Sequence, residues 1–266
     1  MRDEESHFTF HISHFTFHIS HLSSHISLMS YLNKSTTDEI RERFDHDVER
    51  FSKLETGQVS TLDATLSLEL ITESAKRINP SATQLLDIGC GAGNYTLKML
   101  SKLPNLNCTL IDLSKPMLDK AFERIAHETE GEVIVVQSDI RDINLSNENY
   151  DIILAGAVLH HLRDDSDWEY VFNKLYKALK PGGSLWISDL IVQHNPLIND
   201  YIWQKYGDYL ESIDGAVYRQ KVLDYIEKED SPRSLNFQLE LLKKVGFREA
   251  EILHKNSCFA AFGAIK

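Results

Sequence analysis

The chain has 266 residues, and its 28 basic and 40 acidic side chains give a formal charge of −12. A composition of 42% hydrophobic and 26% charged residues excludes a mostly disordered chain, a collagen and a disulfide scaffold. The acidic balance suits neither a phosphate backbone nor an anionic membrane, so it argues against membrane association and direct nucleic-acid binding. Three scattered cysteines favour a reduced, cytoplasmic setting.

The N-terminal segment is a repeat. Residues 7–13 and 14–20 both read HFTFHIS, and residues 21–27 read HLSSHIS. Apolar residues alternate with polar ones, so neither a signal peptide nor a membrane span is predicted. A histidine-rich tract can bind metal, but a short repeat without a pairing partner does not offset its ordering entropy. We predict a disordered low-complexity extension over residues 1–34, in which residues 1–28 precede an alternative start at Met29, and no metal site.

Residues 35–266 read as one α/β domain. Helical patterns begin at Thr37 and at Thr61, and the hydrophobic period then changes to that of strands. Helices are predicted at about 93–103, 115–127, 166–179 and 196–212. Five strands alternate with them: Gln84–Ile88, Asn107–Ile111, Val133–Gln137, Ile152–Ala155 and Ser184–Ser188. Such alternation favours a doubly wound, mostly parallel Rossmann-like sheet.

The chain is predicted to close with a helix and a strand pair. The helix is Leu235–Val245, and the strands are Glu249–His254 and Phe259–Ile265, with an antiparallel C-terminal strand. Helices are thus added before the first strand and after the fifth. These additions offer a surface on which a homodimer could form.

A glycine turn follows the first strand, reading Gly89-Cys90-Gly91-Ala92-Gly93-Asn94. Such a turn in an open α/β sheet lets a nucleotide-like ligand approach the backbone. The dinucleotide fingerprint requires a glycine where Asn94 stands. Asp87, two residues before the first glycine, would repel a pyrophosphate but suits a cationic amino-acid moiety.

Acidic residues also end the next two strands. Asp112 lies 25 residues after Asp87, where a carboxylate can accept both ribose hydroxyl protons. Asp139 follows the third strand and can accept an adenine N6–H, with Ile140 against the ring. A single acid at a strand end is commonly a solvated loop carboxylate. Three in consecutive βα units instead indicate one adenosine-containing ligand.

Five motifs together resemble class I S-adenosylmethionine-dependent methyltransferases over about residues 80–190. They read LLDIGCGAGN, LIDLSKPML, VVQSDIRDI, YDIILAGAVLHHL and LKPGGSLWISDL. The resemblance implies S-adenosylmethionine as cofactor and a turn at Leu179–Gly183 before the fifth strand. It also implies a set of cofactor-binding residues: Asp87, Gly89, Cys90, Gly91, Gly93, Asp112, Leu113, Asp139, Ile140 and Ala155.

The flanking segments are similar to a narrower group, the carboxy-S-adenosylmethionine synthases, whose product is used on the wobble uridine of tRNA. Phe44-Asp45-His46-Asp47-Val48 resembles their N-terminal helix, and the tail from Leu242 to Gly263 resembles theirs. The glycine loop and the His160-His161 pair depart from that group and are typical of small-molecule methyltransferases. Carboxylation and a non-catalytic cofactor-binding scaffold stay open as alternatives.

Methyl transfer mainly requires alignment of donor and acceptor, and a general base helps where the acceptor loses a proton. His160 and His161 follow the fourth strand at the ligand-binding edge, so one of them is the candidate base; the alternative is a structural role. Substrate contacts are predicted from Trp203, Tyr206 and Arg219, with packing or surface charge as alternatives. We predict a methyltransferase that acts on a small molecule.

Overall fold

The computed structural model describes residues 34–53 and 58–266. The chain divides into two units after Lys34, and the second unit, Ser35–Lys266, contains the sheet and both cavities of the site. The predicted low-complexity extension, with its histidine repeat, lies outside the described residues. Over the described ranges, none of the helices is long and apolar enough to cross a membrane.

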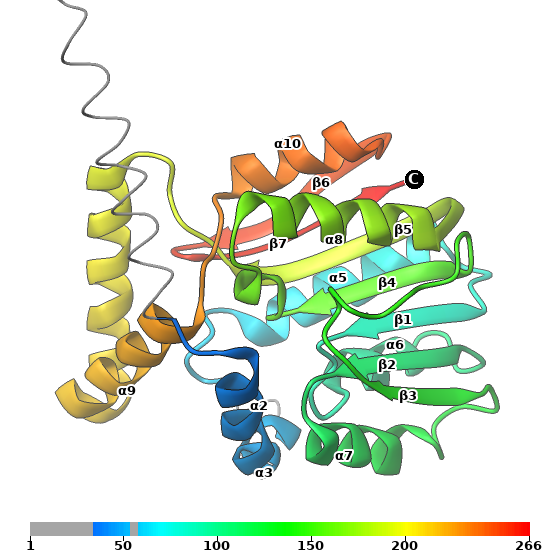
Figure 1. Ribbon diagram of the computed structural model, residues 1–266, viewed down its shortest axis with the longest axis horizontal. Helices are drawn as coiled ribbons and strands as arrows, with labels where there is room; N and C mark the ends of the chain where they lie inside the picture. Colours follow the sequence, from blue (N-terminus) through cyan, green and yellow to red (C-terminus); the bar gives the residue numbers. More distant parts are fainter. Residues whose placement is uncertain (1–33, 54–57) are drawn as a thin grey trace, which may run out of the picture. The chain divides into compact units, whose positions relative to one another are not determined.

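Seven strands of the described chain form one sheet in the order β3-β2-β1-β4-β5-β7-β6 (Figure 1). The first five run parallel, whereas β7 is antiparallel to both of its neighbours. This arrangement confirms the predicted doubly wound, mostly parallel sheet with an antiparallel C-terminal strand. The strands are β1 (Gln84–Ile88), β2 (Asn107–Asp112), β3 (Val133–Gln137), β4 (Tyr150–Gly156), β5 (Leu179–Leu190), β6 (Glu249–Asn256) and β7 (Phe259–Ile265).

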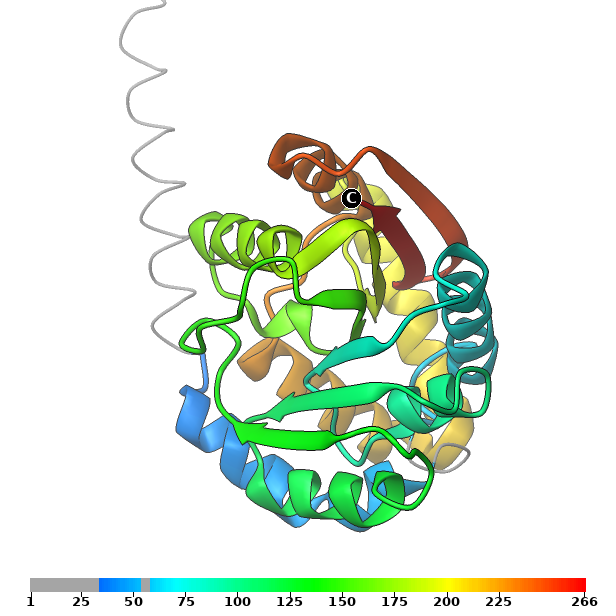
Figure 2. The same cartoon turned by 90° about the vertical axis from the view of Figure 1, so that its right-hand side faces the viewer.

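Helices cover both faces of the sheet, as Figure 2 shows in a second view. On one face, Ile71, Met99 and Leu118 of α5, α6 and α7 pack against the strands. On the other face, Trp168 and Leu241 of α8 and α10 do so. These helices are α5 (Ala64–Ile78), α6 (Asn94–Leu100), α7 (Lys115–Ile125), α8 (Asp165–Ala178) and α10 (Leu235–Val245).

Three further helices lie beyond the carboxyl ends of the parallel strands: α2 (Thr37–His46), α3 (Val48–Ser52) and α9 (Pro196–Glu229) (Figure 1). The start of α2 is fixed by a capping box, because Thr36 Oγ1 accepts the backbone N–H of Glu39 while Glu39 accepts that of Thr36. The N–H of Ser35 donates to the carbonyl of Lys228 at 2.9 Å, which ties α2 to the end of α9.

Three differences from the prediction are larger than a shift of a few residues at one end of an element. The first helical pattern breaks at Asp47, so α2 and α3 are separate helices. The helix predicted over 196–212 continues to Glu229, with a break at Asp214–Gly215 where Gly215 has φ +76°. The predicted turn Leu179–Gly183 lies inside β5 as an irregularity, since pairing with β4 passes from Tyr150↔Leu179 to Ile152↔Ser184.

The strand register brings several chain segments to one edge. Ile88 at the end of β1 is level with Ile111 of β2 and with Ala155 of β4, and Ala155 is level with Ile187 of β5. The residues that follow these positions therefore meet at the carboxyl edge, where open α/β sheets bind ligands.

Candidate functional site

In the glycine turn after β1, Gly89 and Gly91 are required for different reasons. A Cβ at Gly89 would lie 2.4 Å from Cγ2 of Val158, so this glycine allows the turn to pack against the loop after β4. Gly91 has φ +49°, and a Cβ there would meet no atom within 4 Å. Gly91 therefore leaves its backbone open toward a cavity, as close approach of a ligand requires.

Asp112 at the end of β2 is fixed by backbone groups. Its Oδ2 accepts the N–H of Gly91 and its Oδ1 accepts the N–H of Ser114, both at 2.8 Å. Burial raises the pKa of Asp112 to about 6, although these hydrogen bonds oppose the shift. The carboxylate is thus held rigidly at the cavity wall.

Asp87 in β1 is 1% exposed and accepts a hydrogen bond from Thr96 Oγ1 at 2.7 Å. Burial raises its pKa to about 7, and the charge of Asp112 contributes to the increase. The backbone N–H of Thr96 donates to Asp87 as well, and a buried carboxylate with so few donors is costly unless a cation or further donors complete its surroundings.

One cavity of about 110 Å³ lies against the glycine turn. Of the residues predicted to bind cofactor, six line it: Asp87, Gly89, Cys90, Gly91, Asp112 and Leu113. The structure also places Met117, Gly156 and Tyr95 in this cavity. The sequence motifs do not predict these three lining residues, because their positions depend on how the helices and strands pack.

The other four predicted cofactor residues do not line this cavity. Gly93 faces α7, where a Cβ would lie 2.6 Å from Ile125. Asp139 pairs with Arg141 at 2.6 Å, which holds its pKa below the usual value against the opposing effect of burial. Ile140 and Ala155 are buried in the core of the sheet. Their proposed contacts with an adenosine stay predictions.

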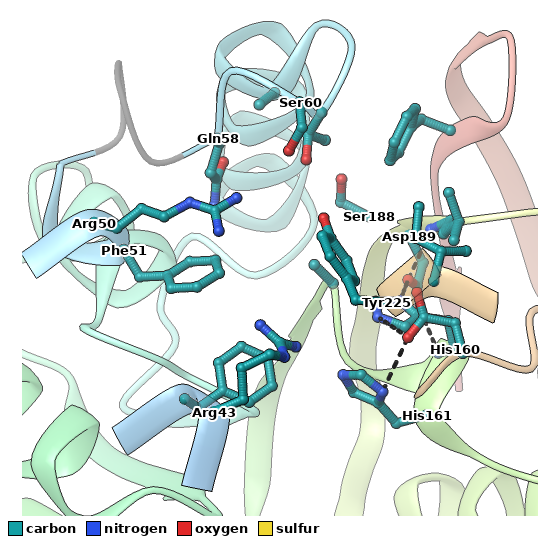
Figure 3. Close-up of a pocket in the computed structure, with 18 of the residues that line it drawn as sticks. Arg43, Arg50, Phe51, Gln58, Ser60, His160, His161, Ser188, Asp189 and Tyr225 are labelled. Carbon is teal, nitrogen blue, oxygen red and sulfur yellow. Dashed lines mark hydrogen bonds and ion pairs between the residues drawn. The ribbon is translucent and has the colours of Figure 1, made fainter. Parts of the chain in front are cut away.

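A second cavity, also of about 110 Å³, adjoins the first on the side of α9 (Figure 3). The two cavities share six lining residues: Phe44, Phe51, Gln58, Tyr95, Ala157 and His161. Aromatic side chains from α2, α3 and α9 form much of the wall of the second cavity. A ligand in one cavity would therefore lie next to a ligand in the other.

The three residues predicted to contact substrate are separated by the structure. Tyr206 lines the second cavity, and its hydroxyl donates to the carbonyl of Ser60 at 2.9 Å. Trp203 packs edge-on against Tyr206 with ring centroids 5.8 Å apart and is not part of the lining. Arg219 also lies outside the lining and pairs with Glu211 at 2.9 Å.

His160 and His161 occupy a 3₁₀ turn, η1 (Leu159–His161), directly after β4. His160 is held by carboxylates on both sides. Its backbone N–H donates to Asp189 at 3.1 Å, its Nδ1 contacts the same carboxylate, and its Nε2 lies 3.7 Å from Asp230. Burial by itself would lower the pKa of His160, but the charges of Asp189 and Asp230 raise it to about 9. His160 is therefore an imidazolium at neutral pH.

His161 has the opposite character. Burial, and then the positive charge of His160, lower its pKa well below the usual value, so the ring is neutral. Its Nδ1 lies 3.3 Å from Asp230 Oδ1, and its buried Nε2 has no hydrogen-bond partner among the described residues. His161 lines both cavities, whereas His160 lines only the second.

Asp230 is the main site residue that sequence reasoning missed. It follows α9, 69 residues after His161, and no motif surrounds it. Ligand atoms of His160, His161 and Asp230 lie within 4.8 Å of one another, a spacing that a metal ion could use. The expectation of no metal site thus stays a prediction.

Comparison with known proteins finds a matching domain family and similar sequences. Residues 85–183 match the family model described as a methyltransferase domain. A carboxy-S-adenosyl-L-methionine synthase from Shigella boydii is 25% identical over 206 residues, which cover 75% of this chain and 81% of the synthase.

Two solved structures have a similar fold. An O-methyltransferase family protein from Burkholderia thailandensis has a TM-score of 0.59 at 18% identity, over 84% of this chain and 61% of that one. Human N-acetylserotonin methyltransferase in complex with SAM has a TM-score of 0.53 at 18% identity, over 78% and 53%. The chain spans less than two thirds of the length of these two proteins.

The sheet order defines a Rossmann-like fold, and its cavity lies against the glycine turn at the carboxyl edge, where such folds bind nucleotide-like ligands. Residues 85–183 form a methyltransferase domain, and the comparisons support the class I S-adenosylmethionine-dependent methyltransferase family with S-adenosylmethionine as cofactor. Both predictions made from the five motifs are confirmed.

The residues of the first cavity fit this cofactor. Two carboxylates, the buried Asp87 and the half-buried Asp112, face a space with largely apolar walls, and the open position at Gly91 leaves room for a ligand against the backbone. Asp112 would hold the ribose hydroxyls of the cofactor, and Asp87 would face its cationic methionine part. The adjoining second cavity would then bind the molecule that accepts the transferred group.

Proposed function

We propose that this protein transfers a methyl group from S-adenosylmethionine to a small-molecule acceptor that carries an ionisable O–H or N–H, with His161 as general base. The observation that carries the proposal is the neutral His161, a residue that lines both cavities and whose buried Nε2 has no hydrogen-bond partner among the described residues. The aromatic side chains that wall the second cavity support a small acceptor with an apolar body.

The chain's own groups have separate tasks in this reaction. When bound, S-adenosylmethionine supplies an electrophilic methyl group on a sulfonium centre and leaves as a thioether. The walls of the second cavity hold the acceptor atom toward the first cavity and exclude water. His161 Nε2 takes the acceptor's proton as the new bond to the methyl carbon forms. Asp230, beside Nδ1, stabilises the resulting imidazolium.

His160 acts as a positioning residue in this proposal. An imidazolium between Asp189 and Asp230 has no free lone pair, so it cannot accept a proton. It fixes the two carboxylates, and its charge keeps the neighbouring His161 neutral. This assigns different roles to two histidines that are equivalent candidates in the sequence.

Carboxy-S-adenosylmethionine synthesis is the second candidate. It is favoured by the match to the synthase over 81% of that enzyme's length and by the similar flanking segments. The neutral His161 and the glycine loop favour methyl transfer. In the synthase alternative the second cavity would hold a carboxyl donor.

Mass spectrometry of the small molecule released from freshly purified, denatured protein separates the candidates. S-adenosylmethionine or S-adenosylhomocysteine is expected, followed by production of S-adenosylhomocysteine when small hydroxylated and aminated acceptors are supplied. The carboxylated cofactor would establish the synthase instead. An absence of S-adenosylhomocysteine binding in a direct titration would leave a scaffold without catalysis.

A further inference from the structure

Two arginines point into the second cavity, the acceptor cavity. Figure 3 shows Arg43 and Arg50 reaching inward on the side opposite the histidines. Arg43 comes from α2 and Arg50 from α3, and neither lines the cofactor cavity. Both cations therefore face the acceptor cavity and not the cofactor cavity.

The charge of Arg43 is matched within the protein. Its Nε and Nη2 donate to Glu229, whose side chain is 7% exposed, at distances of 2.5 to 2.9 Å. This bidentate pair joins α2 to α9 and uses the donors that a ligand would need. Arg43 is thus a structural part of the wall.

Arg50 has no comparable partner among the described residues. Its Nη1 is 3.5 Å from Asp47 Oδ2, longer than a direct hydrogen bond of about 3.2 Å or less. The same oxygen is 3.7 Å from Arg43, and the Asp47 side chain is 31% exposed to water. The guanidinium also donates to the hydroxyl of Tyr225, a neutral acceptor. Most of its five N–H donors are available to a ligand.

The surroundings of Arg50 define the kind of anion that would fit. The guanidinium lies 5.1 Å from the ring centroid of Phe51, and Tyr206 and Tyr225 line the same cavity. Asp189 and Asp230 on the histidine side disfavour a doubly charged group. A planar monoanion attached to an aromatic or other flat apolar body satisfies both conditions, and carboxylate matches the planar guanidinium fork.

We propose that the acceptor is a small carboxylic acid with a flat apolar body, whose carboxylate is bound by Arg50 while its reacting group faces His161. This inference rests on the proposed function, because it names the substrate class of the same site. The acid end and the reacting end lie on opposite sides of the cavity.

Calorimetric titration of matched probes tests the inference. The probes are 4-hydroxybenzoate, 4-hydroxyphenylacetate and indole-3-acetate, each beside its neutral primary amide, added to protein saturated with S-adenosylhomocysteine. At least one acid is expected to bind about tenfold more tightly than its amide. Arg50→Gln should remove this preference and Arg50→Lys should keep part of it. Arg248→Gln, at an exposed arginine paired with Glu249, is the matched control and should keep all of it.

The results separate this inference from the proposed function. Equal binding of acids and amides, no detectable binding of any acid, or an unchanged preference in Arg50→Gln would overturn the inference. Normal S-adenosylhomocysteine affinity in Arg50→Gln, together with loss of the acid preference, supports it. The proposed function fails on a different observation, which is absence of methyl transfer to acids and neutral acceptors alike.

Discussion

The two adjoining cavities are built in different ways. The cofactor cavity is formed largely by consecutive segments, since Asp87, the glycine turn and Asp112–Leu113 lie within 27 residues of one another. The acceptor cavity is assembled from α2, α3, η1, β5 and α9, with contributors from Arg43 to Phe259. The first is held by backbone hydrogen bonds, and the second by side-chain ion pairs between helices.

This difference between the two cavities indicates that specificity for the acceptor can change while the cofactor cavity is kept. Backbone groups hold Asp112 and depend little on side-chain identity. The side chains of the helices that build the acceptor cavity are held by few backbone hydrogen bonds, so they can be replaced to suit another acceptor. Catalysis is expected at His161, where the cofactor cavity and the acceptor cavity meet.

The largest expected effect comes from replacing His161, which lies between the two cavities. His161→Gln should lower kcat by about 10²- to 10⁴-fold, because the acceptor's proton then has no base. Affinity for S-adenosylhomocysteine should change far less, since the carboxylates that hold it are untouched. Steady-state kinetics with a competent acceptor and calorimetry with S-adenosylhomocysteine measure the two effects. Unchanged turnover in His161→Gln would remove His161 as the base.

His160 should show its effect in stability. In His160→Gln, Asp189 loses its cationic partner while it is 2% exposed, which should cost about 3 kcal/mol of the free energy of unfolding. The pKa of His160, about 9, lies above its usual value, so its contribution is complete below pH 6.5 and is lost as pH rises through 9.

Urea denaturation at pH 7 and at pH 9.5 measures this contribution. The wild-type protein should lose stability between the two values, and His160→Gln should lose less. His127→Gln, at an exposed histidine of the same chain, is the control and should behave as the wild type. A His160→Gln protein as stable as the control at pH 7 would contradict the ion pair.

The next-largest effect is expected in Asp112→Asn, on cofactor binding. The variant removes the charge that fixes the Gly91 and Ser114 N–H groups and accepts ribose hydroxyls, so S-adenosylhomocysteine affinity should fall about 10- to 100-fold. Asp119→Asn, on the exposed side of α7, is the matched control. Equal affinity in both variants would show that the ribose assignment is wrong.

The same division explains what the sequence could predict. Strands β1, β3 and β7 have the predicted bounds, because each is a short apolar run that ends in turn or polar residues. Asp87 and Asp112 could be predicted because the carboxyl ends of parallel strands meet at one edge of the sheet, and this does not depend on how the helices pack. Asp230 and Arg50 could not, since their places depend on the break at Gly215 and on the separation of α2 from α3.

The smallest expected effect is the pH dependence of cofactor affinity. In the free protein, burial holds the pKa of Asp87 at about 7 and that of Asp112 at about 6. A ligand with a cationic amine and ribose hydroxyls prefers both carboxylates ionised, so binding lowers both pKa values and releases protons. Affinity must then decrease as pH falls through 7 and 6. The dissociation constant for S-adenosylhomocysteine should rise about tenfold between pH 7.5 and pH 5.5.

Calorimetry in buffers of different ionisation enthalpy counts the released protons directly. Asp112→Asn should release fewer, because one of the two titrating groups is gone, while the dependence on Asp87 persists. The acceptor cavity supplies the contrast, since His161→Gln leaves both carboxylates in place and should keep the wild-type pH profile of cofactor binding. A flat profile in the wild-type protein would mean that neither carboxylate changes its protonation on binding between pH 5.5 and pH 7.5, which would contradict the raised pKa values of Asp87 and Asp112 in the free protein.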